Sequence, residues 1–426
     1  MSPAENATLA LPERAPTLLP ARGFARLVRD QVLSRLAHLE EGRLTVNDLT
    51  EGGRQHVFGG PGALQATVTI RDPRAWAALA LGGTIGAADA YADGWWDADD
   101  VAATIRIVLG AGDGADAFES GLAKVGALWH RLRHRVRKNT IPGARENIAA
   151  HYDLGNEFFE LFLDPTMTYS CALYERPDMT LHEAQVAKID RICRKLDLRP
   201  GQHLLEIGTG WGALAMHAAR EYGVKVTTTT LSRRQHEFAS RRVAEAGLSD
   251  RITLLLSDYR ELSGQHDRLV SIEMIEAVGW EYYEAYFGQV GRLLTPDGLA
   301  LVQAITIPDH RFETWKTEPN HINRSVFPGS CIPSTTALLQ AASRSSDLRL
   351  FHLEELGPHY APTLRAWREA LEARWSEARA QGKSERFLRT FSYYLASCEA
   401  GFAERYHGDV QLLFAKPRSR SLPLAL

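Results

Sequence analysis

Short apolar runs alternate with helical patterns through the second half of the chain. The runs lie at residues 204–208, 224–232, 252–258, 269–279 and 300–307. Between them, apolar residues recur at the three- to four-residue spacing of amphipathic helices. Strands separated by helices pair in parallel, and the helices cover both faces of the sheet. We therefore expect an α/β domain with a doubly wound sheet over residues 139–426.

The first part of the chain shows a different pattern. Apolar residues at helical spacing predict a helix over 24–39, and strict alternation at 64–70 predicts a half-buried strand. Residues 23–138 are therefore expected to form a smaller α+β domain, which ends where the NTIPG stretch breaks the pattern. Residues 1–22 are rich in proline and alanine, and we expect a disordered tail there.

Two stretches of this first domain have more than one interpretation. Tyr91, Trp95 and Trp96 cluster in AYADGWWD, which favours core packing, with the lining of an apolar groove as the alternative. Residues 125–138 place apolar side chains on one stripe of a helix and basic side chains on the rest. A basic amphipathic helix can lie on an anionic lipid surface, but a linker helix packed on a neighbour has the same pattern.

Three glycines after the first strand of the second domain mark the candidate site. Gly208, Gly210 and Gly212 occupy every second position of EIGTGWG, and an alanine-rich helix follows. Glycines allow a tight turn and a ligand close to the backbone, while the helix N-terminus offers N–H groups to an anion. The spacing excludes the dinucleotide motif G-x-G-x-x-G and the P-loop. An ordinary strand-to-helix turn remains the alternative.

Composition and charge narrow the function classes. The 426 residues are 45% hydrophobic and 24% charged with a net charge of −3, which argues against a nucleic-acid-binding protein. The four cysteines lack C-x-x-C spacing, which argues against structural zinc and for reduced thiols. No apolar run is long enough to span a membrane, and the N-terminus lacks a secretory signal pattern. We therefore expect a cytoplasmic protein.

The order of motifs resembles that of cyclopropane-fatty-acid synthases and related lipid methyltransferases. The matching stretches are HYDLGNEFFELFLDPTMTYSCALYE, LEIGTGWG, TTLSRRQ, SIEMIEAVG, FPGSCIPS and GPHYAPTLRAW. They span roughly residues 147–416, and YADGWWD in the first domain matches more weakly. The resemblance implies a Rossmann-like methyltransferase sheet and a smaller N-terminal α+β domain that engages lipid.

This family transfers one carbon from S-adenosylmethionine (SAM) to the double bond of an unsaturated phospholipid acyl chain. The resemblance therefore implies a SAM-dependent enzyme that makes cyclopropane fatty acids, peripheral at the inner membrane face. Its expected partners are phospholipid acyl chains at a membrane surface, without nucleic acid or metal, and a homodimer is left open. A lipid-binding protein with an inactive methyltransferase domain is the alternative from another functional class.

The resemblance also implies the catalytic residues. In the family, a bicarbonate ion is understood to remove the proton whose loss closes the ring. A cysteine, a glutamate, a histidine, an isoleucine backbone and a tyrosine form its pocket. The matching residues here are Cys171, Glu276, Gln303, Ile305 and Tyr360. Glu273, three residues before the motif acid, is expected to support the strand rather than to catalyse.

The fold and the resemblance together predict a cofactor site. Ligands of doubly wound sheets bind at the carboxyl ends of the strands, so the loops that follow the strands should face one crevice. The glycine loop is expected around the methionine part of SAM, and Asp258 near the adenine, with a helix N-cap as its alternative role. The expected cofactor-binding residues are Tyr169, Ser170, Gly208, Gly210, Trp211, Gly212, Thr230, Leu231, Gln235, Asp258 and Tyr259.

Two residues depart from the family pattern. Gln303 stands in place of the pocket histidine, and Ala277 in place of the usual histidine after the motif acid. Glutamine donates a hydrogen bond but does not carry a proton near neutral pH. SIEMIEAVG and QAIT resemble a branch that includes enzymes making methylene- or methyl-branched chains. A branched product is therefore the main alternative to the ring.

Two further expectations concern the substrate. The irregular segment at residues 310–334 is expected to be a lid or substrate guide, because long loops over a site often are. The aromatic residues of the C-terminal helices are expected to form core and part of an acyl tunnel.

Overall fold

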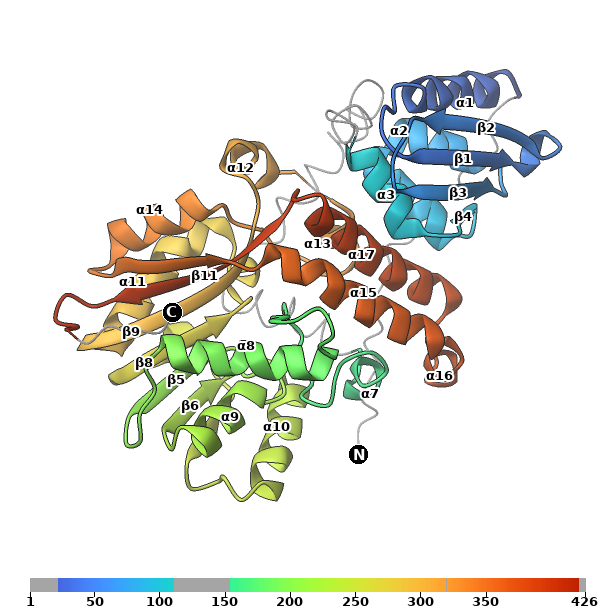
Figure 1. The fold of residues 1–426 in the computed structure, drawn as a ribbon. Coiled ribbons are helices and arrows are strands. Elements are labelled where there is room, and N and C mark those ends of the chain that lie inside the picture. Colours follow the sequence, from blue (N-terminus) through green and yellow to red (C-terminus); the bar gives the residue numbers. More distant parts are fainter. Residues whose placement is uncertain (1–21, 111–153, 319, 421–426) are drawn as a thin grey trace.

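The computed structural model describes residues 22–110, 154–318 and 320–420, which form two sheets with their helices (Figure 1). The first sheet has four strands in the order β2-β1-β3-β4. Its strands are β1 (Arg43–Asp48), β2 (Arg54–Gly59), β3 (Gln65–Ile70) and β4 (Trp96–Ala98), with α1 (Arg22–Leu36), α2 (Arg74–Ala92) and α3 (Val101–Gly110). Every second residue of β1 and β3 is buried, so one face of the sheet packs on the helices.

The second sheet has seven strands in the order β10-β11-β9-β8-β5-β6-β7. The strands are β5 (His203–Ile207), β6 (Lys225–Thr229), β7 (Ile252–Leu255), β8 (His266–Ile272), β9 (Leu294–Thr306), β10 (Arg349–Glu355) and β11 (Gly408–Ala415). Strands β5 to β9 pair in parallel, whereas β11 runs antiparallel to β9 and to β10.

Helices cover both faces of this second sheet. One face carries α8 (Leu181–Lys195), α9 (Ala213–Glu221) and α10 (Arg233–Glu245), and the other α11 (Tyr283–Leu293) and α14 (Thr335–Ser345). Successive residues of β5 show the two-sided burial, since Leu204 packs with α8 and α9 and Leu205 with α11 and α14. The expected doubly wound α/β class is confirmed.

Six further helices lie outside the two layers that cover the seven-stranded sheet in the described residues. They are α7 (Asn156–Phe159), α12 (Asp309–Trp315), α13 (His321–Ser325), α15 (Gly357–Ala373), α16 (Trp375–Ala380) and α17 (Glu385–Ala403). Short 3-10 turns lie at η1 (Leu49–Glu51), η2 (Tyr259–Glu261), η3 (Ile275–Ala277) and η4 (Trp280–Tyr282). Helix α17 packs on α15 and also on α2 and α3, so it links the second sheet's domain to the first (Figure 1).

Arginines of α17 form hydrogen bonds with α2, β4 and the turn between them. Arg389 donates to Asp97 Oδ1 and to the Tyr91 carbonyl, both at 2.7 Å, and its guanidinium lies 4.1 Å from the centre of the Tyr91 ring. Arg386 Nε donates to Asp93 Oδ1 at 2.8 Å. Charge-assisted hydrogen bonds are directional, so these contacts fix the orientation of α17 relative to the end of α2 and to β4.

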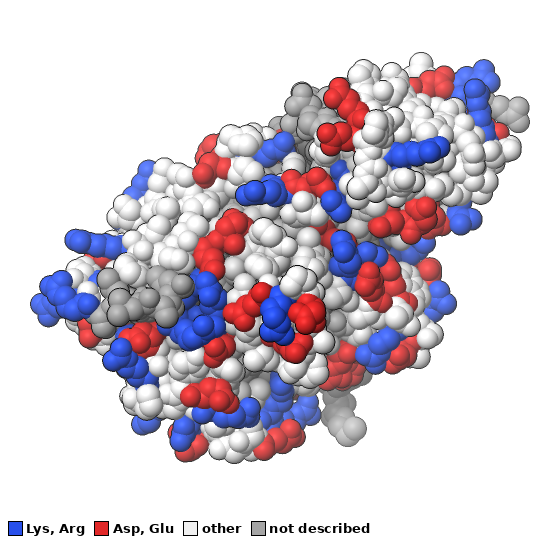
Figure 2. All heavy atoms as spheres, viewed as in Figure 1, with Lys and Arg blue, Asp and Glu red and all other residues white. Residues whose placement is uncertain are grey.

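The surface carries charges of both signs. On the face shown in Figure 2, basic and acidic side chains are intermingled over both parts of the molecule. None of the helices in the described ranges has an apolar stretch long enough to cross a bilayer.

Several expected elements are present with small shifts. The helix expected at 24–39 is α1, which already includes Arg22, and the strand expected at 64–70 is β3. The tryptophans of AYADGWWD are buried in the first core, and Trp96 also lines an apolar cavity there. The segment at 310–334 is not wholly irregular, because it contains most of α12 and all of α13. The domain boundary at 138/139 and the basic stripe at 125–138 lie outside the described residues.

Five strands were not anticipated: β1, β2, β4, β10 and β11. Strands β2 and β10 are edge strands with largely exposed residues, so their sequences RQHVFG and RLFHLEE lack a strong apolar signal. Strand β11 is buried but follows a long helix, and only its pairing with β9 identifies it as part of the sheet.

Replacing Arg389 with alanine should destabilise the protein by about 2–4 kcal/mol, because the Asp97 carboxylate and the carbonyls of Tyr91 and Trp96 would each lose a hydrogen bond from its guanidinium. Urea unfolding followed by tryptophan fluorescence measures this. Arg379→Ala is the matched control, since Arg379 and Glu385 form an exposed pair, and it should cost less than about 0.5 kcal/mol. Equal small losses in both variants would contradict the proposed role of Arg389.

Candidate active site

The glycine loop connects β5 to α9 with a backbone that only glycine adopts easily. The φ angles are 106° at Gly208, 51° at Gly210 and 88° at Gly212. The amides of Gly208 and Thr209 both donate to the Thr229 carbonyl at 3.0 Å, so the end of β6 holds the loop. A side chain added at Gly210 would meet no atom within 4 Å, so this backbone borders open space.

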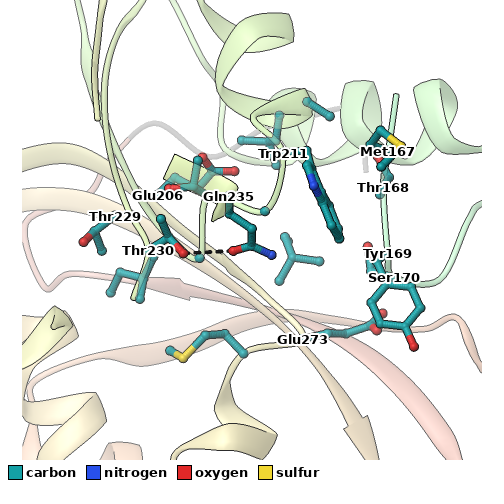
Figure 3. Close-up of a pocket in the computed structure, with 18 of the residues that line it drawn as sticks. Met167, Thr168, Tyr169, Ser170, Glu206, Trp211, Thr229, Thr230, Gln235 and Glu273 are labelled. Atoms are coloured by element: carbon teal, nitrogen blue, oxygen red, sulfur yellow. Dashed lines mark hydrogen bonds between the residues drawn. The ribbon is translucent and has the colours of Figure 1, made fainter. Parts of the chain in front are cut away.

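A cavity lies against this loop at the carboxyl ends of β5, β6 and β8. Figure 3 shows Glu206, Thr230 and Gln235 on one side, Trp211 and Tyr169 on the other, and Glu273 at the edge. Its other lining residues are Met167, Thr168, Ser170, Lys188, Ile189, Ile207, Gly208, Thr209, Gly210, Ala213, Leu214, Thr229, Leu231, Ser257, Tyr259, Ile272, Met274 and Ala277. The crevice expected at the strand ends is therefore present.

Most of the expected cofactor-binding residues line this cavity, and two do not. Gly212 sits at the N-cap of α9, where its α-carbon faces Ala239. Asp258 caps the η2 turn and pairs with Arg260 at 2.7 Å, so its carboxylate is committed to the loop. The helix-cap alternative therefore describes Asp258 better than contact with adenine. Its neighbour Tyr259 does line the cavity.

One wall of the cavity is aromatic and apolar. The Trp211 ring lies 5.0 Å from that of Phe159, and its Nε1 donates to Asn156 Oδ1 at 2.8 Å. The Tyr169 ring lies 5.0 Å from Trp367 on α15. These rings belong to one buried cluster that extends through α7, α15 and α17. The cavity is therefore polar on the β6 side and aromatic on the side of the C-terminal helices.

Glu206 is a buried acid on the polar side. Its Oε2 accepts a hydrogen bond of 2.6 Å from Thr228 Oγ1, which also contacts Thr209 Oγ1 at 2.7 Å. Burial raises the pKa of Glu206 to about 8. The side chain is therefore mostly protonated at neutral pH in the protein without ligand.

Glu273 lies at the centre of a second polar group, at the edge of the cavity. Its Oε1 accepts from the Cys171 amide and from Gln303 Nε2, both at 2.8 Å, and its Oε2 accepts from the Tyr360 hydroxyl at 2.5 Å. Cys171, Gln303 and Tyr360 were each expected in the site from the sequence. The structure brings them together around a residue that was assigned a supporting role.

The backbone of Glu273 is also unusual. Its φ is 46°, in the left-handed region that non-glycine residues rarely occupy, directly after the last residue of β8. Burial raises the pKa of Glu273, and the hydrogen bonds from Tyr360 and the Cys171 amide oppose that rise. A sequence signal was present, because Glu273 is the first residue after a strand and such positions face the ligand in this fold.

A chain of hydrogen bonds fixes which end of Gln303 faces Glu273. Lys195 Nζ has only hydrogens to offer and donates to Gln411 Oε1 at 2.7 Å. Gln411 Nε2 then donates to Gln303 Oε1 at 3.0 Å, which leaves Gln303 Nε2 to donate to Glu273 and to Asp409 Oδ2 at 2.9 Å. Gln303 Nε2 is therefore a donor to two carboxyl groups. The orientation of its amide is set by the chain of donors that begins at the Lys195 ammonium group.

Glu276 contacts Ile305, another residue of the expected catalytic set. Its Oε1 accepts from the Ile305 amide at 2.6 Å, which ties η3 to the end of β9. Its Oε2 is buried without a hydrogen-bond partner among the described residues. Burial, followed by the charge of Glu273, raises the pKa of Glu276 to about 8. Like Cys171, Gln303, Ile305 and Tyr360, Glu276 does not line the cavity itself.

The Cys171 side chain is fully buried. Its Sγ donates to the carbonyls of Ala172 at 3.3 Å and Leu356 at 3.6 Å. Burial, together with the charges of Asp409 and Glu273, raises its pKa well above that of a free thiol. Cys171 contacts Glu273 through its backbone amide.

Comparison with known proteins identifies the family. A family model described as mycolic acid cyclopropane synthetase matches residues 140–412. The chain belongs to this family. The resemblance drawn from the motifs is therefore confirmed.

Relatives in this family extend over most of the chain. The tuberculostearic acid methyltransferase UfaA1 of Mycobacterium tuberculosis is 38% identical over 331 residues, which are 76% of this chain and 77% of that protein. The cyclopropane-fatty-acyl-phospholipid synthase of Escherichia coli is 37% identical over 357 residues, which are 82% of this chain and 87% of that protein.

Solved structures of the family share the fold. The cyclopropane synthase MmaA2 from Mycobacterium tuberculosis aligns with a TM-score of 0.60 at 36% identity, over 64% of this chain and 98% of that one. The mycolic acid cyclopropane synthase CmaA1, complexed with SAH and CTAB, aligns with the same TM-score at 38% identity and the same coverage. This member of the cyclopropane synthetase family is therefore a SAM-dependent methyltransferase.

The raised pKa of Glu206 gives a testable dependence of stability on pH. Between the free value of 4.5 and about 8, the folded protein holds a proton that the unfolded chain has released. The free energy of unfolding should therefore fall as pH rises through this window, by on the order of 1 kcal/mol per pH unit for such a group.

Glu206→Gln should remove this contribution without changing the side chain's size. Urea unfolding at several pH values, without ligand, should give a shallower slope for the variant than for the wild type. Some slope remains, because Glu276 also has a pKa of about 8. Parallel slopes for the two proteins would show that Glu206 does not hold the extra proton.

Proposed function

We propose that the enzyme transfers one carbon from SAM to the double bond of an unsaturated acyl chain in a phospholipid, giving a cyclopropane fatty acid. The observation that carries this proposal is the Glu273 carboxylate at the edge of the cofactor cavity, next to an aromatic, apolar wall. An acid beside a dry surface suits a reaction that passes through a carbocation and ends with loss of a proton.

The cavity suits SAM because of its own residues. The glycine loop leaves bare backbone at one side, and buried Thr230 and Gln235, which bond each other at 2.9 Å, offer polar atoms at another. We assign the methionine part to the glycine loop and Trp211, and the ribose to Thr230, Leu231 and Gln235. When bound, SAM supplies a methyl group made electrophilic by its sulfonium.

The chain's residues then have three tasks. The aromatic wall, with Tyr169 and Trp367, keeps water from the cation and accepts an apolar chain. The Tyr360 hydroxyl and the Cys171 amide hold the Glu273 carboxylate in one place. Glu276 fixes the Ile305 backbone at the end of β9 and so keeps that side of the site in register.

A branched acyl chain is the second candidate product. It is favoured by Gln303 and Ala277, which replace histidines of the family pattern, and by the likeness to UfaA1. Ring and methylene branch arise from the same cation and differ in which carbon carries the charge when the proton leaves. Either product balances without a reductant, whereas a saturated methyl branch needs a hydride donor in addition.

The substrate places the enzyme at a membrane surface. Phospholipid acyl chains are reached from the bilayer, so we propose peripheral binding at the inner membrane face, as a monomer or a homodimer. The basic residues at 125–138 support this, since their sequence combines an apolar stripe with cationic side chains.

The product is tested in a bacterial host that lacks its own cyclopropane synthase. Fatty acids from cells expressing the protein should gain one CH₂, detected by mass spectrometry after derivatisation. Fragments of a ring support the first product, and fragments of a methylene branch support the second. No added carbon in the wild type would contradict both and favour a lipid-binding protein.

Gly208→Val is the control for this measurement. At a φ of 106° a branched side chain is strained, so the loop should lose its shape and the modification should disappear. Modified lipid at wild-type levels in this variant would mean that the glycine loop does not bind the cofactor.

Membrane binding is tested by charge reversal at Arg131, Arg135 and Lys138. With all three replaced by glutamate, association with phosphatidylglycerol vesicles in a sedimentation assay should weaken by at least about tenfold, because each cation near such a surface contributes about 1 kcal/mol.

The matched control reverses the same number of charges elsewhere. Arg176, Arg199 and Arg344 have side chains 60%, 65% and 67% exposed, and their replacement by glutamate changes the net charge equally. Vesicle binding should then fall much less. Equal losses in the two triple variants would mean that net charge, and not the 125–138 stretch, governs the association.

A further inference from the structure

Three donors converge on the Glu273 carboxylate. The Cys171 amide can only donate, and the Lys195-Gln411 chain fixes Gln303 Nε2 as a donor as well. The Tyr360 hydroxyl completes the set, and burial together with the charge of Glu273 raises its pKa, so it keeps its proton. These three donors form an anion-binding site, and the anion that occupies it is the Glu273 carboxylate.

The negative charge of the site belongs on Glu273. Two other buried carboxyl groups are near. Among the described residues, Asp409 Oδ2 accepts from Gln303 Nε2, and Glu276 Oε1 accepts from the Ile305 amide. Asp409 Oδ1 and Glu276 Oε2 have no hydrogen-bond partner among the described residues. Burial and the charge of Glu273 raise the pKa of Asp409 well above its usual value. The group with three donors therefore holds the charge.

A bicarbonate ion does not fit this site. The Cys171 amide, Gln303 and Tyr360 already donate to Glu273, and the Ile305 amide donates to Glu276. A further anion would lie beside the charge of Glu273 and the carboxyl groups of Glu276 and Asp409. In the part of the chain that the structure describes, each of the four donors assigned to bicarbonate is engaged by a carboxyl group.

We propose that the Glu273 carboxylate is the base of the reaction and takes the place of bicarbonate, so that this enzyme works without that ion. Three features of the structure carry the proposal: Glu273 lines the cofactor cavity, its backbone is held in the left-handed region, and its carboxylate receives the donors of the anion site. The proposal rests on the proposed transfer of a carbon to an alkene.

The step balances with residues and substrates already named. An alkene carbon bonds to the methyl carbon as the S–CH₃ bond breaks, and its electron pair leaves with sulfur. The neighbouring alkene carbon becomes a cation. Glu273 removes a proton from the transferred carbon, and the electrons of that C–H bond form a bond to the cationic carbon, which closes the ring. If a hydride first shifts from the methyl-bearing carbon to the cation, the same electrons instead form the double bond of a methylene branch. Glu273 ends as a carboxylic acid and returns the proton to water.

The test uses purified full-length wild type, Glu273→Gln and Glu273→Ala with SAM and vesicles of an oleoyl phospholipid. Each protein is assayed in bicarbonate-free buffer, alone and with added bicarbonate or formate, and the modified fatty acid is measured by mass spectrometry. SAM binding by calorimetry shows whether each variant is folded. Glu273→Gln keeps the shape of the side chain, so it remains informative if the alanine variant fails to fold.

Wild-type activity should be the same with and without bicarbonate. Glu273→Gln should bind SAM and lose at least about 100-fold in rate with no rescue, because its amide fills the site and takes no proton. Glu273→Ala should lose as much and regain part of its rate with formate or bicarbonate, which occupy the vacated donors.

Two results would overturn the proposal. One is a wild type that bicarbonate stimulates several-fold, and the other is a Glu273→Gln variant that transfers carbon at a rate near that of the wild type. In both cases the wild type still modifies the lipid, so the proposed function survives. A wild type that modifies no lipid under any condition rejects the proposed function, and the role of Glu273 with it.

Discussion

A charge buried at the edge of a dry cavity must be held by donors, and this requirement shapes the site. The Glu273 carboxylate takes its donors from the loop before α8, from β9 and from α15, which are far apart in sequence. Lys188 on α8 adds a buried cation to the same region. Removing one partner of a buried charge leaves the rest uncompensated. The site therefore depends on the correct packing of these three elements, because each supplies one of the donors to Glu273.

The C-terminal part of the chain serves both sides of the molecule. Strand β11 brings Asp409 and Gln411 beside β9, and α15 brings Tyr360 and Trp367 over the carboxyl ends of the parallel strands. Helix α17 packs on α15 and also carries the arginines that hold the first sheet's helices. A movement of the first sheet's helices would thus reach the aromatic wall through α17, and also through α13, which contacts α2.

Sequence alone predicted the parts governed by local pattern. The buried strand at β5 and the glycine loop follow from the apolar runs and the glycine spacing. The other residues along the cavity were predicted with the help of the family resemblance. The contacts of the two glutamates did not follow, because both lie in SIEMIEAVG. Only the left-handed backbone at Glu273 aims it at the cavity and leaves Glu276 on the Ile305 amide. The antiparallel edge was missed because β10 is exposed and its pairing is non-local.

An amide side chain has two ends of opposite character, and its neighbours decide which end faces an anion. Here the decision begins at Lys195, which also contacts Glu354 near the protein surface, and passes through Gln411 to Gln303. An isolated change at the outer end of this line, for example to a side chain that accepts a hydrogen bond, would allow both amides to turn over. The carbonyl oxygen of Gln303 would then face Glu273. Lys195 thereby determines whether Gln303 presents a hydrogen-bond donor or an acceptor to the Glu273 carboxylate.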